Sequence, residues 1–225
     1  DGTIVHPQVN ISGNTDIGKT NTFFQFCSIG SPPQDLKFNG EKNFLKIGDS
    51  NIFREGCTVN PGTEGGGLTT EIGNNSLFMT GAHIAHDCKV GNETVFANQA
   101  TLGGHVTIGD NAILGGLCGV HQFCRIGKLA MIGGLSAVHN DVIPYGLASG
   151  NRAKLEGINL IGLKRAGYSS EGIKDFVKTI NTIFLSNSIE SKSIEFKESI
   201  NELVIDACSF IEGKSSRGLC PYAKR

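Results

Sequence analysis

Four consecutive stretches of 18 residues decide the fold: IGNNSLFMTGAHIAHDCK (72–89), VGNETVFANQATLGGHVT (90–107), IGDNAILGGLCGVHQFCR (108–125) and IGKLAMIGGLSAVHNDVI (126–143). Each begins with an aliphatic residue and a glycine, and its small and aliphatic positions recur every six residues. Three hexads per coil describe the three faces of a triangular prism, with a short strand on each face. One coil cannot bury its own inward side chains, so coils stack and their strands pair in parallel. The sequence therefore predicts an all-β solenoid, a parallel β-helix, in which residues 18 apart lie on top of one another.

Two insertions interrupt this period nearer the start of the chain. Ile17 and Ile47 are 30 residues apart, one coil plus 12, and Ile47 and Ile72 are 25 apart, one coil plus 7. We therefore expect two outward loops, over residues 31–43 and 61–70, of which the second contains three consecutive glycines. Such loops often carry function, although the triglycine loop is equally consistent with a tolerated decoration.

The period changes near residue 150, which divides the chain into a hexapeptide-repeat domain (1–150) and a C-terminal helical domain (151–225). Ser169 or Ser170 can cap a first helix. Its expected apolar face is Ile173, Phe176, Val177, Ile180, Ile183 and Phe184. A polar break is expected over 186–193. A second amphipathic helix is expected from Ile200, Leu203, Val204, Ala207, Cys208 and Ile211.

Composition argues against several classes of protein. A formal net charge of −1 gives no general electrostatic case for nucleic acid or a membrane surface. No apolar run approaches the ~18 residues of a membrane span, and no signal peptide is visible. The seven cysteines lack a CxxC spacing, which favours small buried hydrophobes in a reducing compartment over disulfides or metal ligands. We expect a cytoplasmic protein that is not integral to a membrane.

The stacking rule gathers scattered polar residues into one stripe across about four coils. The stripe consists of Asn60, His86, Asp87, His105, His121 and Gln122, with His83 three residues before His86. A neutral imidazole is the natural general base near pH 7, and a carboxylate can fix its tautomer. His86 and Asp87 can form such a pair only at a corner, because adjacent residues of a strand point oppositely.

The neighbouring residues indicate how such a base would act. Gly103 and Gly104 offer bare backbone N–H groups to a developing oxyanion. No serine or cysteine is obviously paired with the base, which favours direct attack by a bound acceptor without a covalent intermediate.

Two other interpretations compete with this one. A zinc ion held by His86, His105 and His121 would need ligand atoms within about 2.1 Å of one point, whereas these residues occupy three different columns. A purely structural or ligand-binding solenoid would show the same hexads, but it would not need His86, Asp87, Gly104 and His105 in adjoining columns.

Six motifs together resemble the UDP-N-acetylglucosamine acyltransferase family of lipid A biosynthesis. They are QDLK (34–37), AHIAHDC (82–88), GHV (104–106), VHQF (120–123), Asn159 with GLKR (162–165), and SRGL (216–219). The resemblance covers the whole chain, which starts in mid-pattern without Met and is expected to lack about two N-terminal coils of the family. It implies a left-handed β-helix, an exception to the right-handed crossover rule, assembled as a homotrimer with sites between neighbouring prisms.

The resemblance also implies the reaction, which is transfer of a 3-hydroxyacyl group from acyl carrier protein to the sugar 3-position of UDP-N-acetylglucosamine. The acyl carrier protein thioester is a co-substrate, and no cofactor or metal is implied. His86 resembles the general base, Asp87 its partner, and the Gly104 N–H the oxyanion donor. A larger side chain at the position of Gly134 would stop the acyl chain earlier, so glycine predicts a fairly long chain.

The substrate contacts are carried over in the same way. Asp35 and Lys37 resemble sugar contacts, assisted by Gln34 and His83. His105, His121 and Gln122 resemble substrate-positioning groups. Asn159 and Arg165 resemble the nucleotide and phosphate end, where a guanidinium suits a diphosphate.

Three residues depart from the family pattern: Asn60 replaces a common His, Ile161 a usual Glu, and Ala166 a usual second Arg. Asn60 cannot hold a proton at pH 7, but its oxygen could accept a hydrogen bond from a sugar 3-amine. The acceptor is therefore either the 3-hydroxyl or the 3-amino analogue of the sugar. A sugar-nucleotide N-acyltransferase that uses acetyl-CoA is a further alternative, disfavoured by the HIAHDC and QDLK motifs.

Overall fold

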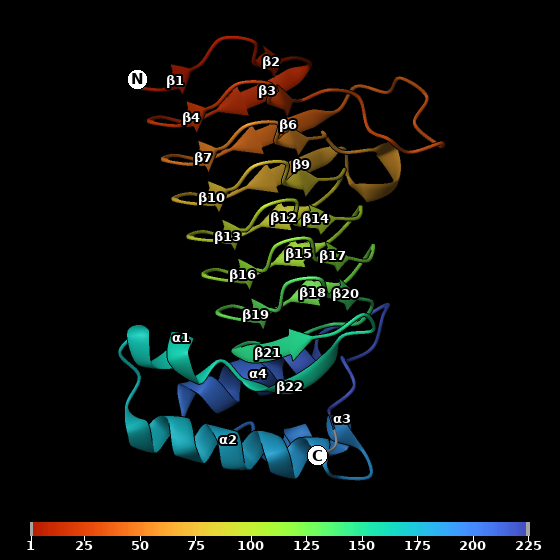
Figure 1. The fold of residues 1–225 in the computed structure, drawn as a ribbon. Helices are drawn as coiled ribbons and strands as arrows, with labels where there is room; N and C mark the ends of the chain where they lie inside the picture. Colours follow the sequence, from red (N-terminus) through yellow and green to blue (C-terminus); the bar gives the residue numbers. More distant parts are fainter. Residues whose placement is uncertain (1, 224–225) are drawn as a thin grey trace.

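The computed structural model describes residues 2–223, in which three sheets form the walls of a tall prism above a layer of helices (Figure 1). The first sheet contains β1 (Ile4–Val5), β4 (Thr22–Phe23), β7 (Ile52–Phe53), β10 (Leu77–Phe78), β13 (Val95–Phe96), β16 (Ile113–Leu114), β19 (Met131–Ile132), β21 (Gly146–Ser149) and β22 (Lys154–Ile158). The second contains β2 (Asn10–Ile11), β5 (Ser28–Ile29), β8 (Thr58–Val59), β11 (His83–Ile84), β14 (Thr101–Leu102), β17 (Gly119–Val120) and β20 (Ala137–Val138). The third contains β3 (Asn14–Ile17), β6 (Phe44–Ile47), β9 (Thr69–Ile72), β12 (Lys89–Val90), β15 (Thr107–Ile108) and β18 (Arg125–Ile126).

The strand register follows the predicted offsets. Val90 pairs in parallel with Ile108, 18 residues on, while Ile47 pairs with Ile17 and with Ile72 across the two insertions. The insertions are therefore expelled from the coils without disturbing their stacking. Figure 1 shows both loops on the same side of the prism, where the second contains the short 3-10 helix η1 (Glu64–Gly66).

Stacked apolar side chains fill the prism. The rings of Phe23, Phe53 and Phe78 lie one above another, with centroids 4.9 and 4.5 Å apart, and none is accessible to solvent. All seven cysteines are free and buried, which confirms their expected role as small hydrophobes. No helix in residues 2–223 is long and apolar enough to cross a membrane.

The chain turns between faces through residues with positive φ. Asp87, His105 and Phe123 occupy one corner in successive coils, with φ of 60°, 61° and 67°. Non-glycine residues rarely adopt this left-handed conformation, so its recurrence at one corner reflects the geometry of the coil. The corner that a His86–Asp87 pair requires is therefore present.

Below the last coil, β22 turns back antiparallel to β21, and the chain becomes helical. The helices are α1 (Leu160–Arg165), α2 (Ser170–Phe184), α3 (Ile189–Ile194) and α4 (Glu202–Glu212). The predicted face of α2 is confirmed: five of its six residues are buried and Val177 is partly buried against the core.

Two predictions in this region are wrong. The expected polar break contains α3, whose N-cap Ser188 accepts the N–H of Ser191 and whose stability comes from this cap and from packing against α4, not from a periodic apolar face. Ile200 precedes α4 and is fully exposed, since the helix begins only after its N-cap Asn201.

The N-cap of α2 gives a direct test of this region. The Ser169 hydroxyl accepts the Gly172 N–H at 3.0 Å, so Ser169→Ala should lower the free energy of unfolding by about 1 kcal/mol. Ser170→Ala, one residue inside the helix, is the matched control and should change it by less than about 0.5 kcal/mol. Urea denaturation measures both, and equal effects would contradict the capping role.

Candidate active site

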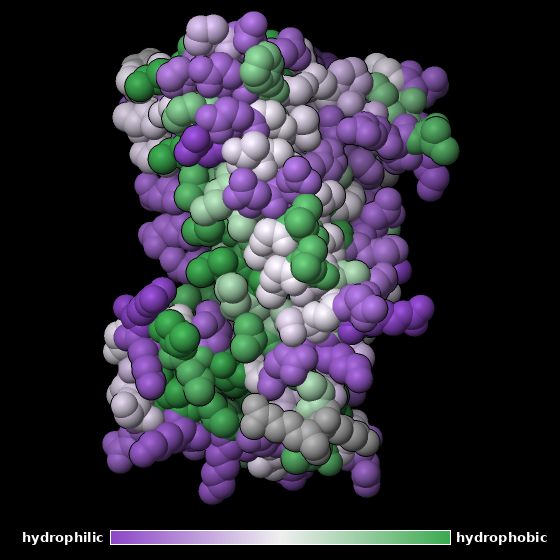
Figure 2. All heavy atoms as spheres, in the orientation of Figure 1, coloured by the Kyte–Doolittle hydropathy of each residue, from purple (hydrophilic) through white to green (hydrophobic). Residues whose placement is uncertain are grey.

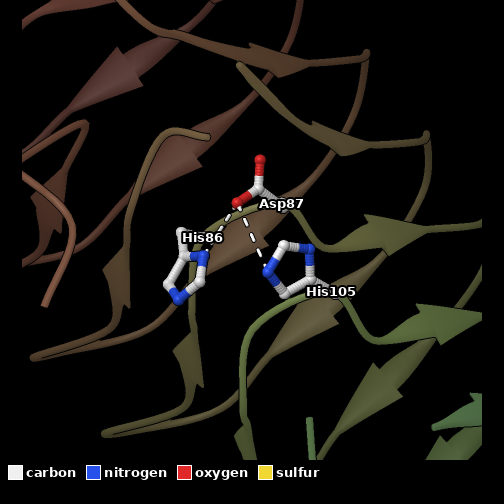
Figure 3. Close-up of side chains that lie close together, drawn as sticks. All are labelled: His86, Asp87 and His105. Carbon is white, nitrogen blue, oxygen red and sulfur yellow. Dashed lines mark hydrogen bonds and ion pairs between the residues drawn. The ribbon is translucent and has the colours of Figure 1, made fainter. Parts of the chain in front are cut away.

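A buried histidine–carboxylate pair lies at the corner after β11 (Figure 3). His86 Nδ1 and the Asp87 Oδ2 atom are 2.8 Å apart, and each residue is 6% exposed. An ionised carboxylate can only accept, so Nδ1 carries the hydrogen and Nε2 is left as the basic atom. The arrangement provides an oriented general base.

Gly104 lies against this imidazole from the next coil. A Cβ at Gly104 would be 2.4 Å from His86 Cε1 and 2.6 Å from Nε2, so no other residue fits there without displacing the ring. Among the hydrogen bonds of the described residues, none uses the Gly104 N–H. The backbone beside the base is therefore free to receive a developing oxyanion.

Asp87 is held by residues that sequence reasoning missed. Thr63 donates its backbone N–H to Asp87 Oδ1 at 2.9 Å and its hydroxyl to Oδ2 at 2.6 Å. The Thr70 hydroxyl accepts the Asp87 N–H at 2.8 Å. Thr63 belongs to the second insertion, where the absence of a period left no signal to find it, whereas Thr70 lies on β9 at an inward position of the coil.

His105 packs beside the pair. Its ring meets that of His86 edge-on at 5.1 Å and stacks on Phe123 at 4.3 Å. Burial lowers the pKa of His105 against the opposing effect of Asp87, so this ring stays neutral near pH 7. The Arg217 guanidinium lies 5.8 Å from the centre of the Phe123 ring, and its Nε–H donates to the Gln122 carbonyl at 2.7 Å.

His83 lies on the same coil as His86. Burial lowers its pKa, as does the neighbouring His86, and Nδ1 lies 2.7 Å from the Thr58 hydroxyl. A neutral imidazole is thus available as a hydrogen-bonding group beside the base.

The first insertion brings a second carboxylate to the site. Asp35 Oδ2 lies 3.9 Å from His86 Nε2, on the basic side of the ring. Lys37 follows on the same loop, and its backbone N–H donates to Asp35. Gln34 is exposed beside them.

Asn60 anchors that loop. Its amide nitrogen donates to the carbonyls of Ser31 and Pro32 at 3.0 and 3.2 Å. Its Oδ1 atom is buried and has no hydrogen-bond partner within residues 2–223, which leaves one acceptor unused beneath the first insertion.

The remaining predicted residues lie apart from the pair. His121 and Gln122 are exposed two coils further along the same corner, and the His121 ring lies 5.7 Å from that of His139. Gly134 is exposed at the corner that joins the first and second sheets.

Asn159 and Arg165 line a separate cleft of about 1010 Å³ at another edge of the prism, with Ile161 and Ala166. Asn159 caps α1 by accepting the Gly162 N–H at 2.9 Å, and it donates to the Leu129 carbonyl. Figure 2 shows apolar side chains gathered over β16, β19 and α1, where this cleft lies. No residue of the His86 cluster lines it, so one chain carries the two predicted groups on different edges.

The zinc set considered from sequence does not assemble in the part of the chain that the structure describes. The trio whose possible ligand atoms lie within 4.8 Å of one another is His86, Asp87 and His105, without His121. In that trio, His86 Nδ1 and Asp87 Oδ2 are hydrogen-bonded to each other.

Comparisons with known proteins show the family of the chain. Residues 69–104 match the bacterial transferase hexapeptide family, and residues 141–220 match the second domain of UDP N-acetylglucosamine O-acyltransferase. The chain is 55% identical to the acyl-[acyl-carrier-protein]–UDP-N-acetylglucosamine O-acyltransferase of Rickettsia bellii, over 100% of this chain and 81% of that protein. The corresponding enzyme of Rickettsia canadensis is 54% identical over 100% of this chain and 86% of its own length.

Solved structures give the same result. A UDP-N-acetylglucosamine acyltransferase crystal structure superimposes with a TM-score of 0.95 at 40% identity, covering 100% of this chain and 87% of that one. LpxA from Acinetobacter baumannii gives 0.91 at 41% identity, covering 97% and 86%. The repeats and the oriented histidine define a hexapeptide-repeat acyltransferase. Within that class, the chain belongs to the UDP-N-acetylglucosamine O-acyltransferase family.

Proposed function

We propose that this protein transfers a 3-hydroxyacyl group from acyl carrier protein to the 3-position of UDP-N-acetylglucosamine, the first step of lipid A biosynthesis. The observation that carries the proposal is the 2.8 Å contact between His86 Nδ1 and Asp87, which leaves Nε2 open beside Gly104 and Asp35. Family membership supplies the donor and the acceptor.

The geometry supports a single displacement. His86 Nε2 removes the proton of the sugar nucleophile as it attacks the thioester carbonyl, and Asp87 stabilises the imidazolium. The Gly104 N–H donates to the oxyanion of the tetrahedral intermediate. Collapse breaks the C–S bond, and the imidazolium returns the proton to the departing thiol. No covalent enzyme intermediate, cofactor or metal takes part.

We infer the substrate roles from the family resemblance, with the position of each side chain as support. Asp35, Lys37 and Gln34 contact the sugar from the first insertion, with His83, His105, His121 and Gln122 along the corner. Gly134 leaves room for a long acyl chain. The cytoplasmic location stays a prediction.

We further infer that the site is completed by a second copy of the chain. The Asn159–Arg165 cleft lies on a different edge from His86, so a substrate that spans both groups has to lie between two prisms. This supports the homotrimer of left-handed prisms that family resemblance implies.

A second acceptor is favoured by one observation. Within residues 2–223, Asn60 Oδ1 is buried without a hydrogen-bond partner, and a sugar 3-amine brings an additional donor that a hydroxyl lacks. The alternative function is therefore amide formation on the 3-amino analogue of the sugar.

The decisive assay supplies 3-hydroxyacyl carrier protein with each acceptor in turn and follows product mass. If Asn60 Oδ1 accepts a hydrogen bond from the sugar 3-amine, Asn60→His should lower the ratio of amine to hydroxyl turnover about fivefold. That factor corresponds to the free energy of one hydrogen bond. Asn187→His, exposed in the helical region, is the matched control. Turnover of the hydroxyl sugar alone would exclude the amine, and turnover with acetyl-CoA alone would exclude the proposed donor.

A further inference from the structure

The triglycine loop rests directly on the carboxylate partner of the base. A Cβ at Gly66 would lie 2.0 Å from Asp87 Cγ, so the backbone of η1 lies against Asp87 with no room for a side chain between them. Thr63, the N-cap residue of η1, is 4% exposed and donates to both carboxylate oxygens. The loop thus contacts the catalytic pair from outside the coil.

Other contacts fix this loop in place. The Asn43 side chain donates to the Gly62 carbonyl at 2.8 Å, and the Leu68 N–H donates to the Thr63 carbonyl at 2.9 Å. The Glu64 N–H donates to Glu41 of the first insertion at 3.2 Å. Thr63 is therefore held on both sides, and its hydroxyl direction is set by the fold.

The two donors compete for one oxygen. Asp87 Oδ2 receives the Thr63 hydroxyl at 2.6 Å and His86 Nδ1–H at 2.8 Å. Each hydrogen bond to a carboxylate oxygen withdraws charge that would otherwise stabilise the other donor. The Thr63 hydroxyl therefore weakens the hold of Asp87 on the imidazolium, while the Thr63 backbone N–H keeps Oδ1 in place.

We propose that Thr63 is a positioning residue that tunes the catalytic base through Asp87, and that Gly66 is required because any side chain there would displace the carboxylate. This inference rests on the proposed function of His86 and extends it to the second insertion. Removing the hydroxyl alone should make the His86 imidazolium more stable, so the base becomes available only at higher pH.

The other polar groups that face His86 stay in place in such a variant. They are Asp87 on its own corner, Asp35 at 3.9 Å from Nε2, His105 edge-on from the next coil, His83 on the same coil, and Lys37 on the first insertion. Of these groups within residues 2–223, Asp87 is the one that contacts the Thr63 hydroxyl, so a change in the His86 titration reports on Asp87.

The test titrates His86 by NMR in ¹⁵N-histidine-labelled protein, with the signal assigned through His86→Gln. In Thr63→Val the titration midpoint should rise by about one pH unit, and the acid limb of kcat/KM should move with it. Thr63→Ser restores the hydroxyl and should return both to the values of the unmodified protein. An unchanged midpoint and acid limb in a folded Thr63→Val protein would overturn the inference.

Gly66 and its neighbour Gly65 provide a matched pair that tests whether a side chain at Gly66 would displace Asp87. Gly66→Ala should lower kcat at least tenfold and remove the hydrogen-bonded Nδ1–H signal. Gly65→Ala should change neither, because a Cβ at Gly65 meets no atom within 4 Å. Equal behaviour of the two variants would overturn the steric role. If the unmodified protein transfers no acyl group, the proposed function fails, while the NMR titration still decides the link between Thr63 and His86.

Discussion

Replacing His86 by alanine should lower kcat about a thousandfold, because the variant loses the group that takes the proton from the sugar nucleophile. The Gly104 N–H and the substrate contacts remain, so substrate binding should change much less than turnover. Steady-state rates with 3-hydroxyacyl carrier protein and the UDP sugar measure both quantities.

His6→Ala is the matched control for that loss. His6 stacks on Phe24 at 4.7 Å at the corner between the first and second sheets, outside the proposed site, and its removal should leave kcat within about twofold. Full activity in His86→Ala would remove the case for base catalysis and support a structural or ligand-binding solenoid.

Replacing Asp141 by alanine should lower the free energy of unfolding by about 3 kcal/mol, since breaking a buried ion pair leaves a charge without its partner. Asp141 is fully buried and accepts the Arg125 backbone N–H at 2.8 Å and its Nε–H at 2.7 Å. The guanidinium also lies 4.3 Å from the Phe210 ring of α4. Asp141 therefore joins the last coil to the helices.

Urea denaturation at one fixed protein concentration measures this effect, because the apparent stability of any protein that assembles depends on its concentration. Lys192→Ala, which breaks the exposed Lys192–Glu195 pair on α3, is the control and should cost less than about 0.5 kcal/mol. A loss in Asp141→Ala as small as in that control would mean that the junction is held by apolar packing alone.

The repeats were predictable because every coil shows the same spacing of aliphatic and small residues. A period of 18 fixes which residues are neighbours, and the observed register at Val90 and Ile108 follows from it. The helical region has no such redundancy. A single stretch of mostly polar residues, as in α3, becomes helical through its cap and its packing, which a local pattern does not reveal.

The site residues also differ in whether the repeat could place them. His86, Asp87 and His105 lie on coils, so stacking alone placed them at one corner, and the structure brings them together. Thr63 reaches Asp87 from an insertion, whose path no period describes. Asn159 and Arg165 were predictable only from family resemblance, since their cleft shares no edge with the base.

The parallel register between coils also limits how such a site can change. Equivalent corner residues point the same way on successive coils, about 4.8 Å apart along the axis. Moving a polar group from one coil to the next shifts it by that whole step without altering its direction. Along the prism axis, the position of a polar group on the coils can therefore change only in whole steps of one coil. Smaller changes in position have to come from the insertions, which follow no register.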